Sequence, residues 1–397
     1  MAVIKLVKIG DIVATNASSY STKDNWGYVN YLDTGNITQN IIDSIQYIDL
    51  AQEKLPSRAK RKVRENSIVY STVRPNQLHY GIIRNQPKNF LVSTGFTVID
   101  VDESKAVAEY VYYFLTQKEI VESLQAIGEQ SVSTYPSIKP SDIEDIEIPL
   151  PTLDIQKKIV GILKSLDAKI ESNSAINNNL EQQAMAYYRE LFVLGAKTTW
   201  RIGTISDLGS VVGGSTPSKA KEEYYTDSGI AWITPKDLSN DKSKYIYHGE
   251  NDITELGLKN SSAIIMPKGT VLFSSRAPIG YIAIAGCSVT TNQGFKSVIP
   301  KPEIGTAFIY YFLKDNLPII EGMASGSTFK EVSGSTMKNV PAIIPDKETL
   351  AIFNEFCAPI FEQQRVLESE TRSLIEMRDG LLVKLMSGEI DVSTLEI

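Results

Sequence analysis

Two stretches of the chain place apolar residues at alternating steps of four and three, the pattern of helices that pair along a coiled-coil seam. The stretches lie at 151–196 and 346–397, and their two series keep one common register. The apolar seam positions are Ile159, Leu163, Leu166, Ile170, Leu180, Tyr187, Phe353, Ile360, Leu367, Leu374, Leu381 and Leu385. Polar residues such as Asn173 and Gln364 occupy the middle of each series, where they lower stability and specify register.

One amphipathic helix of this length cannot bury its apolar stripe alone, whereas two helices from one chain can bury their stripes against each other. Each helix leads from one globular part toward the start of the other, so we expect an antiparallel pair that acts as a spacer. The alternative is two unrelated helices, each packed on its own domain. Pro359 lies inside the second series, and we expect it to kink that helix or to mark its start.

The globular parts of the chain also repeat each other. Five segments recur in the same order roughly two hundred residues later, which is the signature of a duplicated unit. The pairs are VKIGDI (7–12) with WRIGTI (200–205), SIVYSTVRP (67–75) with TVLFSSRAP (270–278), STGFTVID (93–100) with NQGFKSVI (292–299), YVYYFLTQ (110–117) with AFIYYFLKD (307–315), and EIPLP (147–151) with AIIPD (342–346). The chain is therefore predicted to contain two copies of one unit, each a globular part followed by a helical part.

Each globular part is predicted to mix strands and helices. Segments such as SIVYSTV and TVLFSS are rich in β-branched and aromatic residues, as strands are. One amphipathic helix is expected in each part, at 106–125 and at 306–320. Because strands outnumber helices, the prediction is an α+β class rather than a βαβ array. The predicted domains are 1–150, a central helical spacer at 151–196, 197–345, and a C-terminal helical spacer at 346–397.

Composition limits the class of protein. The chain has 397 residues, of which 42% are hydrophobic and 22% charged, as in globular proteins with two or three domains. No uninterrupted apolar run is long enough for a transmembrane helix, and the N-terminus lacks a secretory signal pattern. The two cysteines, Cys287 and Cys357, are far apart in sequence. This usage fits a reducing compartment and predicts a cytoplasmic protein without a membrane partner.

The charge distribution changes the interpretation of the acidic total. The net charge of −7 at first disfavours binding to nucleic acid. Residues 54–88, however, contain nine lysine and arginine residues and only one acidic residue. Most of the acidity lies at 346–397, which carries −6, either to complement a basic partner or as a solvated face. Phosphate contacts are predicted for Lys54, Arg58, Lys60, Arg61, Lys62 and Arg64, with Lys219 and Lys330 in the second part.

The residues give little support for catalysis by this chain, and we predict no catalytic residue and no metal site. GGSTPSKA at 213–220 resembles a phosphate-binding loop, but Ser218 and Ala220 replace the second glycine and the final hydroxyl. A surface loop is the expected structure. The acidic segment 100–105 has the wrong spacing for a nuclease metal site, and no dinucleotide or methyl-donor fingerprint is present.

Several loops carry the residue types that recognise base edges. Arginine suits guanine, asparagine and glutamine suit adenine, and hydroxyl groups suit either. The predicted base contacts are Arg74, Asn76, Gln77, His79, Thr134 and Tyr135 in the first part, and Thr234, Lys236, Ser274, Ser275, Arg276, Ser327 and Thr328 in the second. Each loop alone is typical of a solvated surface. Their repetition in two units favours recognition of two DNA half-sites that differ in sequence.

The chain resembles the specificity subunits of type I DNA restriction-modification systems over its full length. The residues that carry the resemblance are LPTLDIQKKIVGILKSLDAKI (150–170), RDGLLVKLMSGEI (378–390), VGGSTPSK (212–219), WITPKDLS (232–239) and RAPIGYIAI (276–284). It implies two mixed α/β target-recognition domains joined by two long antiparallel helices that form a coiled coil, with a pseudo-two-fold internal repeat.

The resemblance also implies function and partners. Such a subunit is not catalytic, and it reads an asymmetric bipartite target with an unread spacer. It recruits two DNA adenine methyltransferase subunits, which bind S-adenosylmethionine, and restriction-translocase subunits join them. No cofactor is expected on this chain itself. Double-stranded DNA is the expected partner of the globular domains, and the outward helix faces are the expected docking surface for the methyltransferases.

Three alternatives remain open from the residues. One is a specificity subunit of another restriction type, whose partner fuses endonuclease and methyltransferase. Another is a coiled-coil scaffold that binds proteins rather than DNA, which the basic stretch and the unequal loops disfavour. The third is an autonomous enzyme with its own methyl-donor site, which the missing motifs disfavour.

Overall fold

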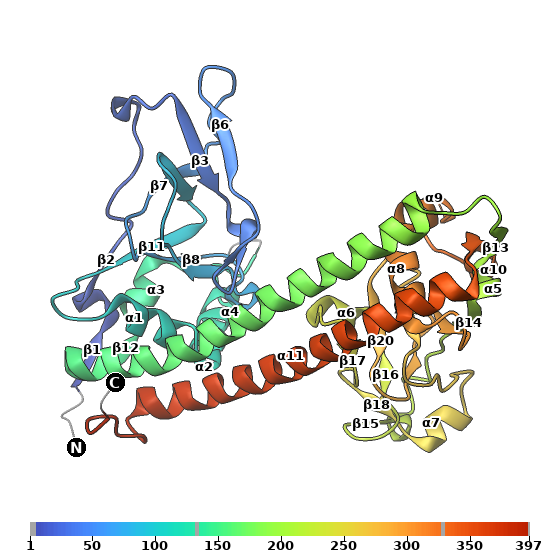
Figure 1. Ribbon diagram of the computed structural model, residues 1–397. Coiled ribbons are helices and arrows are strands. Elements are labelled where there is room, and N and C mark those ends of the chain that lie inside the picture. Colours follow the sequence, from blue (N-terminus) through green and yellow to red (C-terminus); the bar gives the residue numbers. More distant parts are fainter. Residues whose placement is uncertain (1–4, 132–134, 327–329, 396–397) are drawn as a thin grey trace. The chain divides into compact units, whose positions relative to one another are not determined.

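The computed structural model describes residues 5–131, 135–326 and 330–395. The chain divides into two compact units (Figure 1). Unit 1 comprises Met1–Lys169 and Leu374–Ile397, and unit 2 comprises Ile170–Ser373. Both divisions fall inside the two long helices, so each unit contains part of each helix.

Unit 1 contains two four-stranded sheets, in the orders β6-β3-β10-β7 and β2-β11-β8-β9, and a strand pair β1–β12. The strands are β1 (Lys5–Lys8), β2 (Val13–Thr15), β3 (Tyr28–Leu32), β4 (Ile37–Thr38), β5 (Ile41–Ile42), β6 (Gln46–Asp49), β7 (Ala59–Lys62), β8 (Ile68–Ser71), β9 (Tyr80–Ile82), β10 (Phe90–Ser93), β11 (Phe96–Val101) and β12 (Glu147–Leu150). The helices are α1 (Ala108–Leu115), α2 (Lys118–Glu129) and α3 (Pro140–Glu144).

Strand β11 explains how the layers of unit 1 are joined. Successive side chains of a strand point to opposite faces of the sheet. Phe96 and Val98 accordingly enter a core between the two sheets, whereas Ile99 and Val101 enter a core with α1. That second core also holds Ile159 and Leu163 of α4, so helix α1 lies between the sheet and the long helix (Figure 1).

Unit 2 has a five-stranded sheet in the order β14-β22-β19-β20-β17 and three strand pairs, β13–β23, β15–β18 and β16–β21. The strands are β13 (Arg201–Thr204), β14 (Gly209–Gly213), β15 (Tyr225–Thr226), β16 (Trp232–Ile233), β17 (Tyr245–Ile246), β18 (Asp252–Ile253), β19 (Val271–Phe273), β20 (Ile282–Ala285), β21 (Thr290–Thr291), β22 (Lys296–Pro300) and β23 (Pro341–Ile344). The helices are α5 (Ile205–Leu208), α6 (Pro235–Asn240), α7 (Glu255–Lys259), α8 (Thr306–Asp315), α9 (Leu317–Gly322) and α10 (Gly334–Lys338).

The single helix expected in each globular part is in fact two helices. In unit 1 the chain breaks between α1 and α2, where the Thr116 hydroxyl donates to the Tyr113 carbonyl and Gln117 is extended. Such a local hydrogen bond competes with continuation of the helix. In unit 2 the break precedes Pro318, which has no backbone N–H to donate. The apolar periodicity continues across both breaks, which is why the sequence pattern does not reveal them.

Two long helices complete the fold, α4 (Leu153–Arg189) and α11 (Lys347–Ser387), and a π-helical turn at Glu190–Leu194 follows α4. Asp346 caps the start of α11, since its carboxylate accepts hydrogen bonds from the Thr349 backbone N–H at 2.8 Å and from the Trp200 indole at 2.8 Å. The expectation that Pro359 marks the start is therefore wrong, because Pro359 lies within the helix.

The long helices pack against each other in antiparallel order within each unit, as predicted. In unit 2 the Asn173 amide donates to Glu370 at 2.9 Å, whereas the Tyr187 ring, farther along α4, meets the earlier Phe353 of α11. In unit 1 Arg378 pairs with Asp167 at 3.0 Å. All the predicted seam positions are buried or half-buried, including the polar Asn173 and Gln364. The α+β class and the coiled-coil pairing are confirmed.

Candidate nucleic-acid interface

The same hydrogen-bonded frame holds one loop in each unit. In unit 1 the Thr72 backbone N–H and hydroxyl both donate to the Gly95 carbonyl, at 2.8 and 2.9 Å. In unit 2 Ser275 donates in the same way to Gly294, at 2.7 and 3.1 Å. These residues occupy matching places in the repeated segments. The frame therefore presents the loop after β8 and the loop after β19 at equivalent positions of their units.

In unit 1 this loop brings four of the predicted base contacts together. Arg74 has a left-handed backbone with φ of 48°, and its guanidinium lies 4.6 Å from the centre of the Tyr135 ring. The Tyr135 side chain is exposed. Asn76 and Gln77 follow in a short 3-10 helix at Pro75–Gln77 and are also exposed. An arginine, two amides and an aromatic ring thus lie on one loop surface, and these residue types form hydrogen bonds and stacking contacts with bases.

His79 has a structural role that the sequence did not indicate. Its Nδ1 lies 2.7 Å from the Ile37 carbonyl and 3.3 Å from the Thr38 hydroxyl, so it ties the β4–β5 hairpin to the loop. An Nδ1 that donates to a carbonyl leaves Nε2 of a neutral ring as an acceptor. Any contact of His79 with a base therefore falls to Nε2.

The basic stretch of unit 1 divides into two groups. Lys54, Arg58 and Lys60 are exposed, and Arg61 is half-buried on β7. Lys62, in contrast, pairs with Asp24 at 2.5 Å, and this ammonium group lowers the pKa of the Asp24 carboxyl.

Arg64 is also engaged within the fold. Its Nη2 donates to the Val101 carbonyl at 2.6 Å, and its Nε lies 3.3 Å from Asp100. The phosphate contacts predicted for Lys62 and Arg64 would therefore compete with ion pairs inside the fold, although the Arg64 side chain is 58% exposed.

In unit 2 the exposed Arg276 extends from the loop after β19. Its Nε lies 3.1 Å from Oε2 of Glu331, and the backbones of the two residues form an antiparallel bridge. Lys296 Nζ lies 3.6 Å from Oε1 of the same carboxylate. One acidic side chain therefore lies between two cations on this loop surface.

Three hydroxyl residues predicted to read bases are used by the fold instead. Ser274 and Ser275 are 0% exposed, and their hydroxyls donate to the Pro278 and Gly294 carbonyls. This burial excludes direct base contact, so those two predictions are wrong. The Thr234 hydroxyl donates to Asp237 at 2.7 Å in the cap that begins α6. Serine and threonine serve as caps and readers alike, and sequence does not separate the two uses.

The predicted lysines of unit 2 remain at the surface. Lys219 and Lys330 are exposed. Lys236 is exposed too but pairs with Glu250 at 2.6 Å, and that hydrogen-bonded carboxylate raises the pKa of the lysine. Three further predicted base contacts, Thr134, Ser327 and Thr328, lie outside the described residues.

Two polar residues beside the loop of unit 2, Thr216 and Gln293, were not among the residues predicted from the sequence. Gln293 is exposed, and its Oε1 accepts a hydrogen bond from the Thr216 hydroxyl. Gly214 allows this approach, because a Cβ there would lie 2.0 Å from the Asn292 carbonyl oxygen. The repeat offered a signal, since Gln293 aligns with Thr94 beside the paired glycines Gly95 and Gly294.

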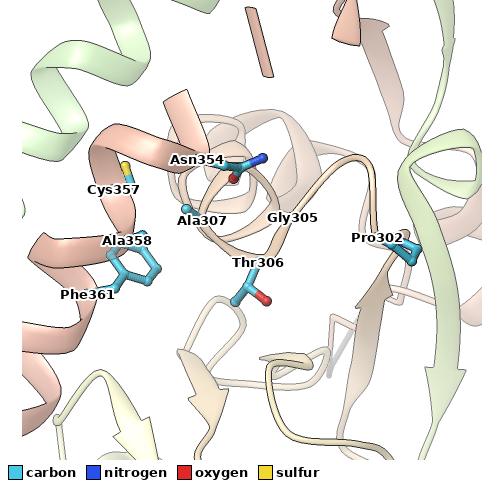
Figure 2. Close-up of a pocket in the computed structure, with 8 residues that line it drawn as sticks. All are labelled: Pro302, Gly305, Thr306, Ala307, Asn354, Cys357, Ala358 and Phe361. Carbon is cyan, nitrogen blue, oxygen red and sulfur yellow. The ribbon is translucent and has the colours of Figure 1, made fainter. Parts of the chain in front are cut away.

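A cavity of about 290 Å³ lies in unit 2 between the start of α8 and α11, away from these loops (Figure 2). Its polar walls are used by the fold: Thr306 donates to the Gly269 carbonyl and Asn354 to the Ile304 carbonyl. Burial raises the pKa of the Cys357 thiol to about 12, so this cysteine stays protonated at neutral pH.

The described residues contain no group of three or more histidine, cysteine or acidic side chains placed to hold a metal ion. Within the same residues, no helix is both long and apolar enough to span a bilayer.

Known proteins similar to this chain place these surfaces in context. Residues 1–182 and 197–367 match the family described as type I restriction modification DNA specificity domain. The specificity subunit of the HindI type I restriction enzyme of Haemophilus influenzae is 26% identical over 462 residues, which covers 97% of this chain and 99% of that protein. The MjaIX specificity subunit of Methanocaldococcus jannaschii is 43% identical over 178 residues, covering 43% of this chain and 41% of that protein.

A solved structure agrees at the level of the fold. The type I restriction-modification S subunit from M. genitalium aligns with a TM-score of 0.54 at 18% identity, over 97% of this chain and 96% of that one. The family match covers the globular part of both repeated units, most of α4 and about half of α11. The chain therefore belongs to the type I restriction-modification DNA specificity family.

Proposed function

We propose that this chain is the DNA-specificity subunit of a type I restriction-modification assembly and reads an asymmetric target of two half-sites. The observation that carries the proposal is the shared frame with unequal loop tips. Thr72 and Ser275 anchor their loops by the same pair of hydrogen bonds. The tips differ, because unit 1 presents Arg74 against a tyrosine and unit 2 presents Arg276 against a carboxylate. Equivalent frames with different side chains suit two half-sites of different sequence.

The exposed lysine and arginine side chains would supply affinity for DNA, and the loop tips would supply sequence specificity. Lys54, Arg58 and Lys60 in unit 1 and Lys219 and Lys330 in unit 2 are free to approach phosphates, which position a protein on a duplex without reading its sequence. We infer that the paired helices set the length of the unread spacer between the half-sites, since a seam that keeps its register makes a stiff connection.

The chain would act as the non-catalytic member of its assembly. Two adenine methyltransferase subunits would dock on the helices and bind S-adenosylmethionine, and restriction-translocase subunits would join them. Within this scheme the specificity chain selects the sequence, and its partners modify or cut the DNA.

Methylation mapping of whole genomes tests the proposal. Cells that express the chain with its partner subunits should carry methylated adenines in one motif of two short half-sites with a fixed gap, and cells without the gene should lack it. The double variant Arg74→Ala with Gln77→Ala should change one half-site only. Arg201→Ala is the matched control, because Arg201 on β13 is an exposed arginine that pairs with Asp207. A genome with no such motif, or one contiguous motif, would contradict the proposal.

A binding selection separates DNA reading from a scaffold role. The full chain, mixed with random duplexes, should enrich one bipartite sequence. The affinity should fall steeply as salt rises, because phosphate contacts release counterions. A scaffold for proteins would enrich no sequence.

A further inference from the structure

Arg276 and Glu331 form an ion pair on the loop surface of unit 2. Arg276 Nε lies 3.1 Å from Glu331 Oε2, and the side chains are 48% and 35% exposed. The same two residues are joined through their backbones in an antiparallel bridge. Both residues of the contact are therefore held on strand-like backbone. The guanidinium of Arg276 reaches solvent, while its Nε edge lies beside the Glu331 carboxylate.

The carboxylate is held from its other side as well. Lys296 Nζ lies 3.6 Å from Glu331 Oε1 and 3.3 Å from the Gln293 carbonyl, and the lysine side chain is only 14% exposed. Each carboxylate oxygen thus faces one cation. Two positive groups around one negative group leave a net positive cluster, which does not repel the phosphates of a nearby duplex.

The remaining donors of Arg276 define what the cluster can recognise. A guanidinium carries five N–H groups in a rigid planar fork, and the contact with Glu331 is made through Nε. Within the part of the chain that the structure describes, the two terminal nitrogens make no hydrogen bond, so they keep parallel donors on the other edge of the plane. Guanine is the base that offers two adjacent acceptors, N7 and O6, in the major groove.

We propose that Glu331 is a positioning residue that orients Arg276 to read one guanine in the half-site recognised by unit 2. This inference rests on the proposed function and adds a named base and a second residue to it. An arginine that is already oriented before DNA binds loses less conformational entropy on binding. Binding to the correct base is therefore tighter than a flexible side chain would allow. Glu331 itself does not touch DNA in this arrangement.

Unit 1 does not repeat the pair, so positioning of an arginine by a carboxylate is confined to the half-site that unit 2 reads. The bridge between Arg276 and Glu331 has its counterpart in a bridge between Val73 and Ser137. Neither of those side chains can form the ion pair. The arginine of unit 1 is the next residue, Arg74, and its guanidinium stacks on an aromatic ring instead.

A simpler role for Glu331 is to close the loop, and the two roles predict different measurements. A structural residue would affect the free energy of unfolding and weaken all duplexes alike. A positioning residue would alter the preference at one base pair and leave the salt dependence unchanged, because the number of phosphate contacts stays the same.

The experiment begins with the wild-type full chain and the duplex that it selects from a random pool. Each guanine of that duplex is then replaced in turn by 7-deazaguanine, which lacks the N7 acceptor. We expect one guanine at which this change weakens binding by about fivefold or more, the effect of losing a base contact. If the chain selects no duplex, the proposed function fails and this inference with it. If it selects one but no guanine responds, the inference alone is overturned.

Variants connect that guanine to the pair. Glu331→Ala and Arg276→Lys should each remove the sensitivity to 7-deazaguanine at that position and keep the wild-type salt slope. Glu331→Gln should retain part of the sensitivity, because its amide oxygen can take the place of the carboxylate oxygen beside Nε. Glu321→Ala, an exposed acid of the same unit, is the matched control for the charge change and should behave as wild type.

Thermal unfolding of each variant identifies any that fails to fold, and Glu331→Gln replaces Glu331→Ala if the alanine variant does. Full 7-deazaguanine sensitivity in a folded Glu331 variant would overturn the proposal. Equal weakening on all duplexes would overturn it too, in favour of loop closure.

Discussion

Lys244 Nζ lies 2.5 Å from Glu181 Oε2 in the interior of unit 2, where the lysine side chain is only 5% exposed. The ammonium also donates to Gln364 Oε1 at 2.5 Å and lies 4.1 Å from the centre of the Phe361 ring. Glu181 belongs to α4, Gln364 and Phe361 belong to α11, and Lys244 directly precedes β17. One buried cation thus joins the sheet of unit 2 to both long helices.

Removal of Glu181 should destabilise unit 2 strongly. Glu181→Ala leaves Lys244 buried without its carboxylate partner, and breaking a buried pair in this way costs about 3–5 kcal/mol. Urea unfolding followed by circular dichroism measures the free energy. Glu171→Ala, an exposed acid on the same helix, should change it by less than about 0.5 kcal/mol. Equal stability of the two variants would show that the buried pair contributes little.

The same pair predicts loss of stability in acid. Burial of Glu181 opposes its ionisation, but the attraction of Lys244 and Lys314 outweighs burial and lowers its pKa from 4.5 to about 2. A carboxyl whose pKa is depressed by folding stabilises the fold above its unfolded pKa and loses that contribution as pH falls toward the folded value. The free energy of unfolding should therefore decline between about pH 4.5 and 2.

Glu368 contributes with the opposite sign, because burial raises its pKa. Comparison with Glu181→Gln isolates the Glu181 contribution, since that variant should lose the decline due to Glu181 and keep the effect of Glu368. An unchanged acid profile in Glu181→Gln would refute the assignment.

The basic stretch of unit 1 should separate into binding and structural residues. Lys60→Ala removes an exposed charge, so it should weaken binding to all duplexes and reduce the salt slope by about one. Lys62→Ala should instead leave Asp24 without its partner and lower the thermal stability slightly, because the pair is partly screened by solvent. Binding titrations over a salt series, paired with thermal unfolding, distinguish the two. The division would be wrong if both variants changed the salt slope equally.

The seam should be sensitive to cavities. Leu163 is 0% exposed in the core that also contains Leu382 and Leu385 of α11. Leu163→Ala should therefore cost about 2–5 kcal/mol through lost burial and the cavity left behind. Leu194→Ala is the matched control, because Leu194 is 85% exposed. Chemical denaturation of the two variants should give clearly separated midpoints, and coincident midpoints would argue against a packed seam.

The helical spacer should determine the gap between half-sites. Insertion of seven residues into both α4 and α11 preserves the heptad register and adds about 10 Å of helix. At about 3.4 Å per base pair, the preferred spacer should lengthen by about three base pairs. Methylation mapping measures this directly. An unchanged gap with retained methylation would remove the helices as the determinant.

Periodicity and repetition were accessible from the sequence because each depends on many residues at once. The heptad series predicted the helix pair, and five ordered matches predicted the duplicated unit. The breaks at Thr116 and before Pro318 depend on one or two residues and were lost in the longer pattern. A break caused by one or two residues ends a helix but leaves the apolar spacing of the sequence around it unchanged.

The candidate site was less accessible, since exposure and pairing depend on the folded environment. Ser274 and Arg276 are near neighbours in one loop, yet one is completely buried and the other reaches solvent. Glu331 escaped notice because it is acidic, and acids are not expected beside phosphates. Its partners Arg276 and Lys296 are distant in sequence and meet it only after the strands are assembled.

The glycine carbonyls that anchor Thr72 and Ser275 have a consequence for how such proteins diversify. The bonds that secure each loop are made by backbone and by the hydroxyls of Thr72 and Ser275, and the side chains that face outward take no part in them. Substitutions at the outward positions can alter which sequence is chosen while the anchoring bonds remain. A lineage under pressure to change its target can therefore vary one half of its recognition at little cost in folding, and keep every companion subunit it already has.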